Sequence, residues 1–569
     1  MARPPAGRLI GLFAVIAVGF GGVAVRLVLL QVREGKAYAS LAAEQRVRRI
    51  PLPAERGTLY DRSMHELALS LPARAVYADP ELIEDPAGTA ARLAPVLGVP
   101  VGRLVRSLST ESRFEYLARR VDLEVAERVE DLGLPGIAFL DEPKRQYPGG
   151  SLAAQVLGFV GLDGAGLAGL ELQYEDILAG NPGSLVVEQD PDGLPIPQGT
   201  RRTVAPQRGR DLLLAIDKDI QFHAERALAD TIRRNGAIGG TVIVLDPATG
   251  DVLAMATEPG FDANAFDTAP PASTRNRSVT DAYEPGSVNK VITAAAALEE
   301  GVIRLGERMW VPSRIQVADR VFHEAHVHPT MAMTLTDVIA QSSNVGTIMT
   351  ADRLGSERLD AYLRAFGFGK PTGIGFPGES DGILMPEDDW WGTSMATIPI
   401  GQGIAVTPLQ MASVYATLAN EGVRVPPRLV RGTIGPSGRV VEDPVAEGVR
   451  VVSARTARLL TGMLAHAVEA GTGQEAQIPG YWVAGKTGTA RKPLADALGY
   501  SDQYVASFIG FAPAREPAVI VAAVIDEPDT VYGGVAAAPL FREVAHFALA
   551  HLQVPTPERP RVPPFVVDG

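Results

Sequence analysis

The sequence predicts an α+β protein with a single N-terminal membrane helix followed by two soluble regions. An uncharged run of 17 residues from Leu9 to Val25 predicts the helix. In the C-terminal half, strand-like apolar runs near residues 241–257 and 504–526 enclose a stretch of helical patterns. Strands at both ends with helices between them indicate an antiparallel sheet flanked by helices. A chain of 569 residues is too long for one core, so we expect more than one domain.

Composition excludes several classes of function. Hydrophobic residues make up 46% of the chain and charged residues 21%, which is typical of a folded protein. The formal net charge of -13 argues against nucleic acid as the main partner, because phosphate binding needs a basic surface. The chain has no cysteine, so disulfides, thiolate catalysis and cysteine-ligated metals are excluded.

The N-terminal apolar run continues to Val32, interrupted only by Arg26 and Gln31, and is long enough to cross a hydrocarbon core of about 30 Å. A cleaved signal peptide is the alternative, because residues 37–39 have the small-x-small form of a cleavage site. Charged residues separate that site from the apolar run, which favours an uncleaved anchor over residues 9–32. Basic residues flank both ends of the run, so charge counting leaves its orientation open.

The soluble part divides at a loose segment. Residues 33–208 show a mixed pattern, and a stretch rich in proline, glycine and charge at 188–211 predicts a hairpin and linker that closes this first region. The second region, 209–553, contains the predicted hairpin at 241–257, whose two apolar runs flank a turn-forming segment. The proline-rich tail at 554–569 is predicted to be unstructured.

A serine and a lysine stand three positions apart at the start of a predicted helix that ends at Gly301. Residues at this spacing share a helix face, so the hydroxyl of Ser287 and the amine of Lys290 can meet. Apolar neighbours would desolvate the amine and lower its pKa, as a lysine base requires. The first helical turn offers free N–H groups to developing negative charge. An ordinary exposed helix start shows the same pattern, so the pair alone does not establish a site.

Two further patterns follow along the chain. Ser342-Ser343-Asn344 begins 55 residues after Ser287, and Lys486-Thr487-Gly488 begins another 144 residues on. Taken singly, a helix N-cap explains the first and a turn explains the second. In this order and at this spacing, the three patterns resemble those of the penicillin-binding and serine β-lactamase superfamily.

The resemblance implies a role for each polar side chain. Ser287 would be the nucleophile and Lys290 its base. Ser342 would relay a proton between that amine and the leaving nitrogen, while Asn344 would hold a substrate amide carbonyl. Lys486 would supply a fixed positive charge for the substrate carboxylate.

The strand that carries Lys486 is expected to bind substrate through three more residues. Thr487 and Thr489 would add hydroxyl donors, and Gly488 would let the strand approach the ligand closely. The resemblance also implies an oxyanion hole made by the backbone N–H groups of Ser287 and Thr489, a feature often worth about 3–4 kcal/mol. No cofactor is implied.

The region before the first pattern carries a second resemblance, to the non-catalytic module of class B penicillin-binding proteins. The stretches concerned are ERGTLYDR at 55–62, FEYLARRV at 114–121, RQYPGGSLAAQVLGFVG at 145–161 and GLAGLELQYEDIL at 166–178. The resemblance implies an elongated pedestal or dimerisation domain over 33–208 and a penicillin-binding transpeptidase domain over 209–553. Ser63-Met64 stands where the family commonly has Asn-Gly, which puts one local turn in doubt.

The family's activity is D,D-transpeptidation, which cross-links peptidoglycan stem peptides ending in D-Ala-D-Ala through an acyl-enzyme. β-Lactams are expected inhibitors. The resemblance implies a single-pass protein of the bacterial cell membrane with residues 1–8 in the cytoplasm and the catalytic domain outside. It further implies a SEDS-type glycosyltransferase and the division complex as partners, contacted through the membrane helix and the module containing Arg56, Gly57, Asp61 and Arg62. The stretch at 76–80 favours the division branch over the elongation branch.

Other readings of the same patterns are an elongation-type transpeptidase, a β-lactam sensor and an inactive scaffold. A class A β-lactamase would need a Glu-x-x-Leu-Asn stretch, and the chain contains no Leu-Asn pair. A sensor would need further membrane spans and a cytoplasmic effector, for which eight residues before the anchor leave no room. All three motifs are chemically complete, which counts against a scaffold.

A histidine-rich segment invites a metal hypothesis. His323, His326 and His328 lie close together in the sequence with Glu324 beside them, and these residue types are common metal ligands. The segment falls in the connection before Ser342, where the family has a variable loop that often contains histidine. We therefore predict no metal site.

Overall fold

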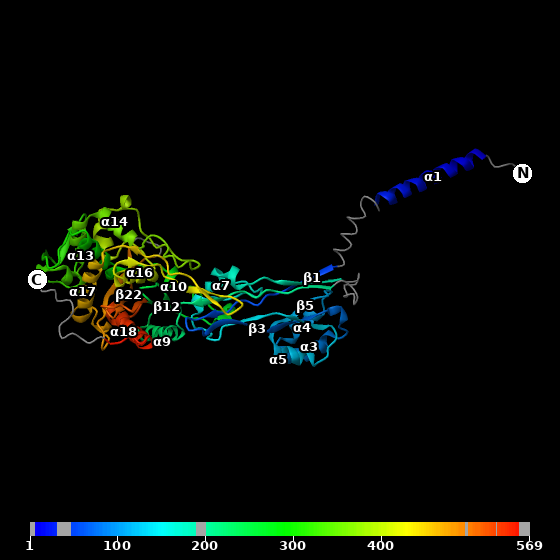
Figure 1. The fold of residues 1–569 in the computed structure, drawn as a ribbon, viewed down its shortest axis with the longest axis horizontal. Helices are drawn as coiled ribbons and strands as arrows, with labels where there is room; N and C mark the ends of the chain where they lie inside the picture. The colour runs from blue at the N-terminus through cyan, green and yellow to red at the C-terminus, as the bar shows by residue number, and fades with distance from the viewer. Residues whose placement is uncertain (1–5, 31–46, 189–200, 495–498, 531, 557–569) are drawn as a thin grey trace. The chain divides into compact units, whose positions relative to one another are not determined.

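The computed structural model describes residues 6–30, 47–188, 201–494, 499–530 and 532–556, which form two compact units (Figure 1). Unit 1 comprises residues 1–55, 72–143 and 180–209, and unit 2 comprises 56–71, 144–179 and 210–569. The chain therefore leaves unit 2 and returns to it twice. The contiguous domains proposed from the sequence, 33–208 and 209–553, stay predictions.

The N-terminal helix α1 spans Ala6–Val28, and its stretch Gly7–Val28 is long and apolar enough to cross a membrane. Its side chains are exposed to the surroundings along Gly7–Val28, as a helix that faces lipid requires. Length and composition fit a membrane anchor and equally a signal sequence. The α-helix ends four residues before the predicted limit, and residues 31 and 32 lie outside the described residues.

The described residues of unit 1 form two three-stranded sheets. In one, the strand order is β5-β4-β6, and helices α3, α4 and α5 pack on it around a core that includes Val76, Leu93 and Leu104. In the other, the order is β1-β8-β9. The further elements of unit 1 are β1 (Val47–Leu52), β4 (Ala73–Ala78), η2 (Pro80–Leu82), α3 (Pro86–Leu97), α4 (Val101–Leu108), β5 (Glu115–Asp122), α5 (Leu123–Glu130), β6 (Ile137–Asp141), β8 (Gly183–Glu188) and β9 (Arg201–Val204).

Unit 2 is built on a five-stranded sheet in which every neighbouring pair is antiparallel, with strand order β12-β11-β23-β22-β21. The strands are β11 (Gly239–Leu245), β12 (Val252–Glu258), β21 (Ala484–Pro493), β22 (Tyr500–Ala512) and β23 (Val519–Asp526). Helices α9 (Lys218–Arg234) and α18 (Gly533–His551) cover one face (Figure 1). The other face packs against α10 (Arg277–Thr280), α11 (Lys290–Glu299) and α16 (Pro408–Ala419). Because both faces are covered, the strands read as almost continuous apolar runs.

A second, six-stranded sheet in unit 2 has the order β19-β18-β10-β2-β3-β7. The remaining elements of unit 2 are β2 (Leu59–Tyr60), β3 (Glu66–Leu71), β7 (Lys144–Gln146), α6 (Ala154–Leu157), α7 (Gly169–Gln173), α8 (Glu175–Leu178), β10 (Asp211–Leu214), η3 (Ala263–Thr268), η4 (Gly286–Asn289), β13 (Met309–Val311), β14 (Arg314–Val317), β15 (Arg320–His323), β16 (Met331–Met333), α12 (Leu335–Ala340), α13 (Asn344–Leu354), α14 (Ser356–Ala365), η5 (Glu387–Asp389), α15 (Ser394–Thr397), η6 (Ile398–Ile400), β17 (Val423–Arg424), β18 (Val430–Ile434), β19 (Val440–Glu442), β20 (Val449–Arg450), α17 (Ala454–Ala470) and η7 (Gln474–Ala476).

Most elements expected from the sequence are present. The hairpin predicted at 241–257 is confirmed, since β11 and β12 pair with Thr241 opposite Thr257. The strands predicted near 504–526 are β22 and β23. Of the hairpin predicted at 188–211, β9 lies inside the predicted segment, but its antiparallel partner β8 begins earlier, at Gly183, and residues 189–200 lie outside the described residues. The predicted tail also lies largely outside them, from residue 557 onward.

The residues predicted to contact a membrane partner are mostly buried in unit 2. Arg56 is 5% exposed, and its guanidinium pairs with the buried carboxylate of Glu171. Arg145 pairs with the other oxygen of the same carboxylate at 2.7 Å. A Cβ on Gly57 would lie 2.0 Å from the carbonyl oxygen of Arg210. These contacts give the residues a structural role, and the burial counts against the predicted partner contact at Arg56 and Gly57.

Asp61 is also buried, and it closes the turn that the sequence left in doubt. Its Oδ1 accepts hydrogen bonds from the backbone N–H groups of Ser63 and His65, each at 2.8 Å. The turn requires a positive φ at Met64, which adopts 69°. Asparagine and glycine adopt this conformation more readily, which explains why methionine looked out of place there. Arg62 is the one residue of the predicted contact set that is half-exposed.

Replacing Glu171 with alanine should strongly destabilise unit 2. The change leaves two buried guanidinium groups without their shared carboxylate, which typically costs about 3–5 kcal/mol. All four tryptophans lie in unit 2, so tryptophan fluorescence in a urea titration of the full-length protein reports its unfolding. The exposed Glu516→Ala provides the control and should leave the unfolding midpoint unchanged. Equal midpoints for both variants would contradict the structural role of the network.

Candidate active site

Ser287 is half-buried and lies in a short 3-10 helix, η4, directly before α11. The helix predicted from Ser287 is present, but its first turn is a 3-10 helix and the α-helix α11 begins only at Lys290. The turn is held from two sides. The backbone N–H of Gly286 donates to the carbonyl of Gly401 at 2.9 Å, and the side-chain amide of Asn289 donates to the carbonyl of Ile398 at 2.8 Å. Both contacts fix the position of the serine backbone.

The Lys290 amine is fully buried and contacts the Ser342–Asn344 segment. Its Nζ donates to the backbone carbonyl of Ser342 at 2.6 Å and to Oδ1 of Asn344 at 2.7 Å. The Oγ of Ser342 lies 3.3 Å from the same nitrogen. Ser342 reaches this position with a φ of 60°, a left-handed conformation that is uncommon outside glycine. The structure therefore brings together three of the predicted catalytic residues in one hydrogen-bonded group.

Burial lowers the pKa of Lys290 to about 7, and the negative charge of Glu324 partly opposes this shift. A neutral amine has two hydrogens to donate, and the carbonyl of Ser342 and Oδ1 of Asn344 can accept both. Its lone pair is then free to take a proton. The amine can therefore act as a base near neutral pH.

Lys486 lies on β21 and is also fully buried. Its Nζ contacts oxygen atoms only at longer range, at 3.2 Å to the carbonyl of Thr487 and 3.5 Å to Oγ1 of Thr472. Burial, and then the charge of Lys290, lower the pKa of Lys486 well below its ordinary value. This direction counts against a permanent positive charge on Lys486 before a ligand binds. A substrate carboxylate at this amine would favour its charged form.

The strand β21 packs directly on the serine turn. A Cβ on Gly488 would lie 2.3 Å from the Oγ of Ser507 and 3.0 Å from a methyl group of Val288. Glycine is thus required here by packing within unit 2, in addition to the ligand approach expected from the sequence. The hydroxyl of Thr487 exchanges a hydrogen bond with that of Thr472 at 2.8 Å, and Oγ1 of Thr489 accepts one from the backbone N–H of Gly533.

Two side chains at the site were missed by sequence reasoning. Thr472 contacts both Lys486 and Thr487 from the segment before β21. Glu324 contacts the Ser342–Asn344 segment, although the sequence suggested only a metal ligand. Thr472 lies in no recognised pattern, and the histidine-rich stretch around Glu324 suggested a metal ligand and gave no signal for its contact with the Ser342–Asn344 segment.

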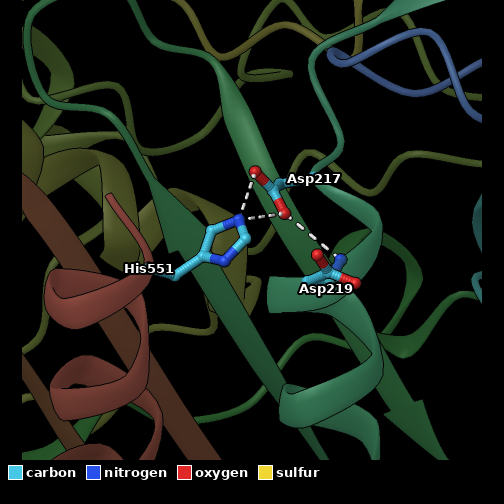
Figure 2. Close-up of side chains that lie close together, drawn as sticks. All are labelled: Asp217, Asp219 and His551. Atoms are coloured by element: carbon cyan, nitrogen blue, oxygen red, sulfur yellow. Dashed lines mark hydrogen bonds and ion pairs between the residues drawn. The ribbon is translucent and has the colours of Figure 1, made fainter. Parts of the chain in front are cut away.

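A separate group of side chains has metal-like spacing. Asp217, Asp219 and His551 offer ligand atoms within 4.8 Å of one another, and Figure 2 shows His551 directed at the carboxylate of Asp217. Asp217 also accepts hydrogen bonds from the backbone N–H groups of Asp219 and Ile220, so it serves as the N-cap of α9. These contacts explain the cluster as a link between α9 and the end of α18.

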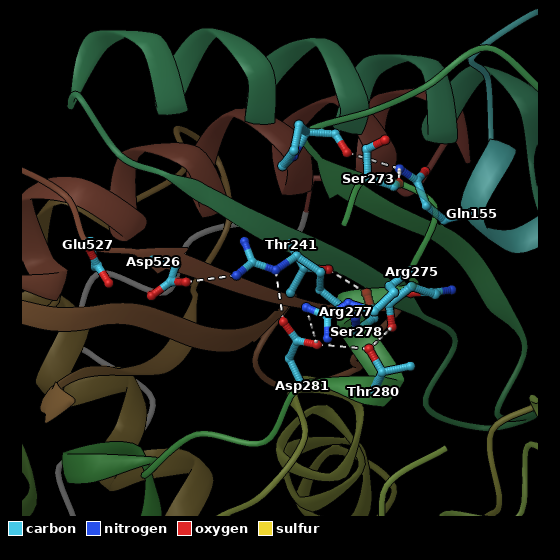
Figure 3. Close-up of polar contacts among 12 residues, drawn as sticks. Gln155, Thr241, Ser273, Arg275, Arg277, Ser278, Thr280, Asp281, Asp526 and Glu527 are labelled. Atoms are coloured by element: carbon cyan, nitrogen blue, oxygen red, sulfur yellow. Dashed lines mark hydrogen bonds and ion pairs between the residues drawn. The ribbon is translucent and has the colours of Figure 1, made fainter. Parts of the chain in front are cut away.

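Charged residues gather at one end of the five-stranded sheet. Arg277 donates to Asp281 at 2.9 Å and to Asp526 at 2.8 Å, so it joins α10 to β23 (Figure 3). A cavity of about 420 Å³ lies beside this network and also borders Glu284, three residues before the serine. Other residues lining the cavity are Arg275, Tyr283, Ala490 and Lys492. The cavity thus borders the segment just before the serine turn and the end of β21.

Comparison with known protein families agrees with this geometry. Residues 240–546 match the model of the penicillin-binding protein transpeptidase domain, and residues 51–214 match that of the penicillin-binding protein dimerisation domain. The chain belongs to the class B penicillin-binding proteins. The comparison therefore confirms the family predicted from the sequence, the FtsI-like class B penicillin-binding proteins.

Relatives of this class B penicillin-binding protein match it over most of their length. Penicillin-binding protein PbpB of Mycolicibacterium smegmatis is 39% identical over 95% of this chain and 89% of its own. Peptidoglycan D,D-transpeptidase FtsI of Escherichia coli is 35% identical over 85% of this chain and 82% of its own. The crystal structure of penicillin-binding protein 3 from Mycobacterium tuberculosis, complexed with aztreonam, matches with a TM-score of 0.71 and 34% identity, covering 90% of this chain and 98% of that one.

Direct titration of the lysine amines should show one group with a midpoint near pH 7. The chain contains only seven lysines, so resonances of 13Cε-labelled lysine can be assigned one by one, with Lys290→Arg identifying the signal. We expect Lys290 to titrate at about pH 7 because burial disfavours its charged form. A midpoint near the ordinary lysine value would contradict the buried-base geometry.

Replacing Gly401 with alanine should displace the serine turn. The new Cβ would lie 2.1 Å from the carbonyl oxygen of Gly286, and the φ of 80° is itself unfavourable for alanine. We expect a loss of about 1–3 kcal/mol in the free energy of unfolding, measured by urea titration. Gly435→Ala is the matched control, because no atom lies within 4 Å of the place its new methyl group would take and its φ is ordinary.

Proposed function

We propose that this class B penicillin-binding protein is a membrane-anchored D,D-transpeptidase that forms an acyl-enzyme on Ser287 and serves cell division. The observation that carries the proposal is the buried Lys290 amine, hydrogen-bonded to Ser342 and Asn344 directly after the serine turn. The Escherichia coli relative, peptidoglycan D,D-transpeptidase FtsI, supports the same activity.

The first half of the reaction transfers a proton and an acyl group. Ser287 Oγ attacks the carbonyl carbon of the penultimate D-Ala while the neutral Lys290 amine takes its proton. The backbone N–H groups of Ser287 and Thr489 stabilise the resulting oxyanion. When the intermediate collapses, the C–N bond breaks, and the proton passes through the hydroxyl of Ser342 to the leaving nitrogen. Free D-Ala departs and an ester on Ser287 remains.

The second half regenerates the serine. An amine from a neighbouring stem peptide attacks the ester, a new C–N bond forms, and the C–O bond breaks. One amine proton returns through Lys290 to Ser287 Oγ, so atoms and charges balance. We assign Lys486, Thr487 and Thr489 to binding the substrate carboxylate, with the charge on Lys486 induced by that anion. Gly488 keeps the strand close to the serine turn.

We further propose that α1 is an uncleaved anchor, with residues 1–8 in the cytoplasm and unit 2 outside. A SEDS-type glycosyltransferase and the division complex are the proposed partners, contacted through α1. Four residues outside the membrane helix were predicted to take part in this contact. Among them Arg62 is the one that is half-exposed, which supports the prediction at that residue.

Incubation of the full-length protein in detergent with a fluorescent penicillin tests the proposed activity. We expect a stable adduct on the peptide that contains Ser287 and none in Ser287→Ala. The rate of adduct formation should rise as the pH passes through about 7, because Lys290 must lose its proton before it can accept one from the serine. Rapid release of hydrolysed penicillin would instead indicate a lactamase. Absence of an adduct on the folded protein would indicate an inactive scaffold.

A further inference from the structure

Glu324 lies at the N-terminus of α13, where it contacts the second and third residues of the Ser342–Asn344 segment. Its side chain is 6% exposed. The carboxylate accepts hydrogen bonds from the hydroxyl of Ser343 and from the backbone N–H of Asn344, the latter at 2.8 Å. The backbone N–H of Val345 adds a third contact at 3.2 Å. One carboxylate therefore satisfies several of the free donors at this helix end.

The residue before Glu324 holds the same segment from the other side. The side-chain amide of Asn344 donates to the backbone carbonyl of His323 at 3.1 Å. This contact orients the amide so that its oxygen faces Lys290, which donates to it at 2.7 Å. The end of β15 and the residue after it thus fix both the backbone and the side chain of Asn344.

We propose that Glu324 is a positioning residue of the acylation reaction, which holds the Ser342–Asn344 segment against Lys290 and places a negative charge near that amine. The inference rests on the proposed function of Lys290 as a base. The charge that acts on the Lys290 amine is the carboxylate of Glu324, which favours the protonated form, and Lys290 in turn lowers the pKa of Lys486. His328 approaches Glu324 from its far side, with 4.0 Å between Nε2 and Oε1.

The sign of the electrostatic effect follows from the charges. A carboxylate stabilises the ammonium form of Lys290 and so raises its pKa, against the larger effect of burial. Glu324→Gln removes the charge and keeps the size of the side chain. The titration midpoint of Lys290 should then fall by about one pH unit. A shift of this size is expected when a charge several ångströms away is removed from a site that water only partly screens.

The experiment measures this midpoint by 13Cε-lysine resonances of the full-length protein in detergent, with Glu324→Gln and Glu324→Asp compared with wild type. Glu324→Asp keeps the charge but shortens the side chain, so we expect a midpoint within a few tenths of a unit of wild type. Both variants should acylate more slowly than wild type at high pH, because the Ser342–Asn344 segment is less firmly held.

Glu299→Gln is the matched control. Glu299 lies on the same helix as Lys290 and, like Glu324, caps another helix, since it accepts hydrogen bonds from the backbone and the hydroxyl of Ser453. We expect its removal to leave the Lys290 midpoint unchanged. The control therefore separates a general loss of a helix cap from the loss of a charge at the site.

A midpoint that stays at the wild-type value in Glu324→Gln would overturn the electrostatic part of the proposal, and unchanged acylation in both variants would overturn the positioning part. If Glu324→Gln does not fold, a lowered midpoint in Glu324→Asp contradicts the proposal and an unchanged midpoint with slower acylation supports it. The lysine titration does not depend on turnover, so failure of Ser287 to react with penicillin is a distinct result that affects the proposed function alone.

Discussion

The burial of the Lys290 amine is the constraint on which the rest of the site depends. An isolated amine in an apolar environment is stable only if it loses its charge or finds hydrogen-bond acceptors. Here it does both, because burial lowers its pKa and the Ser342–Asn344 segment supplies acceptor oxygens. The arrangement requires that α11, the turn before α13 and the strand β21 be held at fixed positions. The packing of unit 2 around the site holds these three elements in place.

The sequence predicted the parts of the site that lie in short local patterns. Ser287 and Lys290 were assigned from their spacing together with the two patterns that follow along the chain, and the structure places them on consecutive helical turns. The strands around the hairpin at 241–257 could be predicted because their apolar runs are long and the turn between them has distinctive residues. The resemblance to a known family, which comparison confirmed, then indicated that the patterns at 287–290, 342–344 and 486–488 form a single site.

What could not be predicted depends on contacts between residues far apart in the chain. Arg56 resembled a surface contact residue, yet its burial follows from Glu171, more than a hundred positions away. Glu324 lies in a histidine-rich stretch that suggested metal binding, and only the folded chain brings it to the start of α13. The charge state of Lys486 likewise depends on how deeply the surrounding elements bury it, which no residue pattern records.

The path of the chain between β3 and β7 has a consequence for how such proteins can diversify. Residues 72–143 depart after β3 and come back at β7, and Leu71 and Lys144 face each other in that antiparallel pair. The two ends of the excursion are therefore only about 5 Å apart. Because both ends of the excursion leave neighbouring strands side by side, we expect its length and sequence to vary without disturbing the pairing of β3 with β7, which needs only that the two ends stay together.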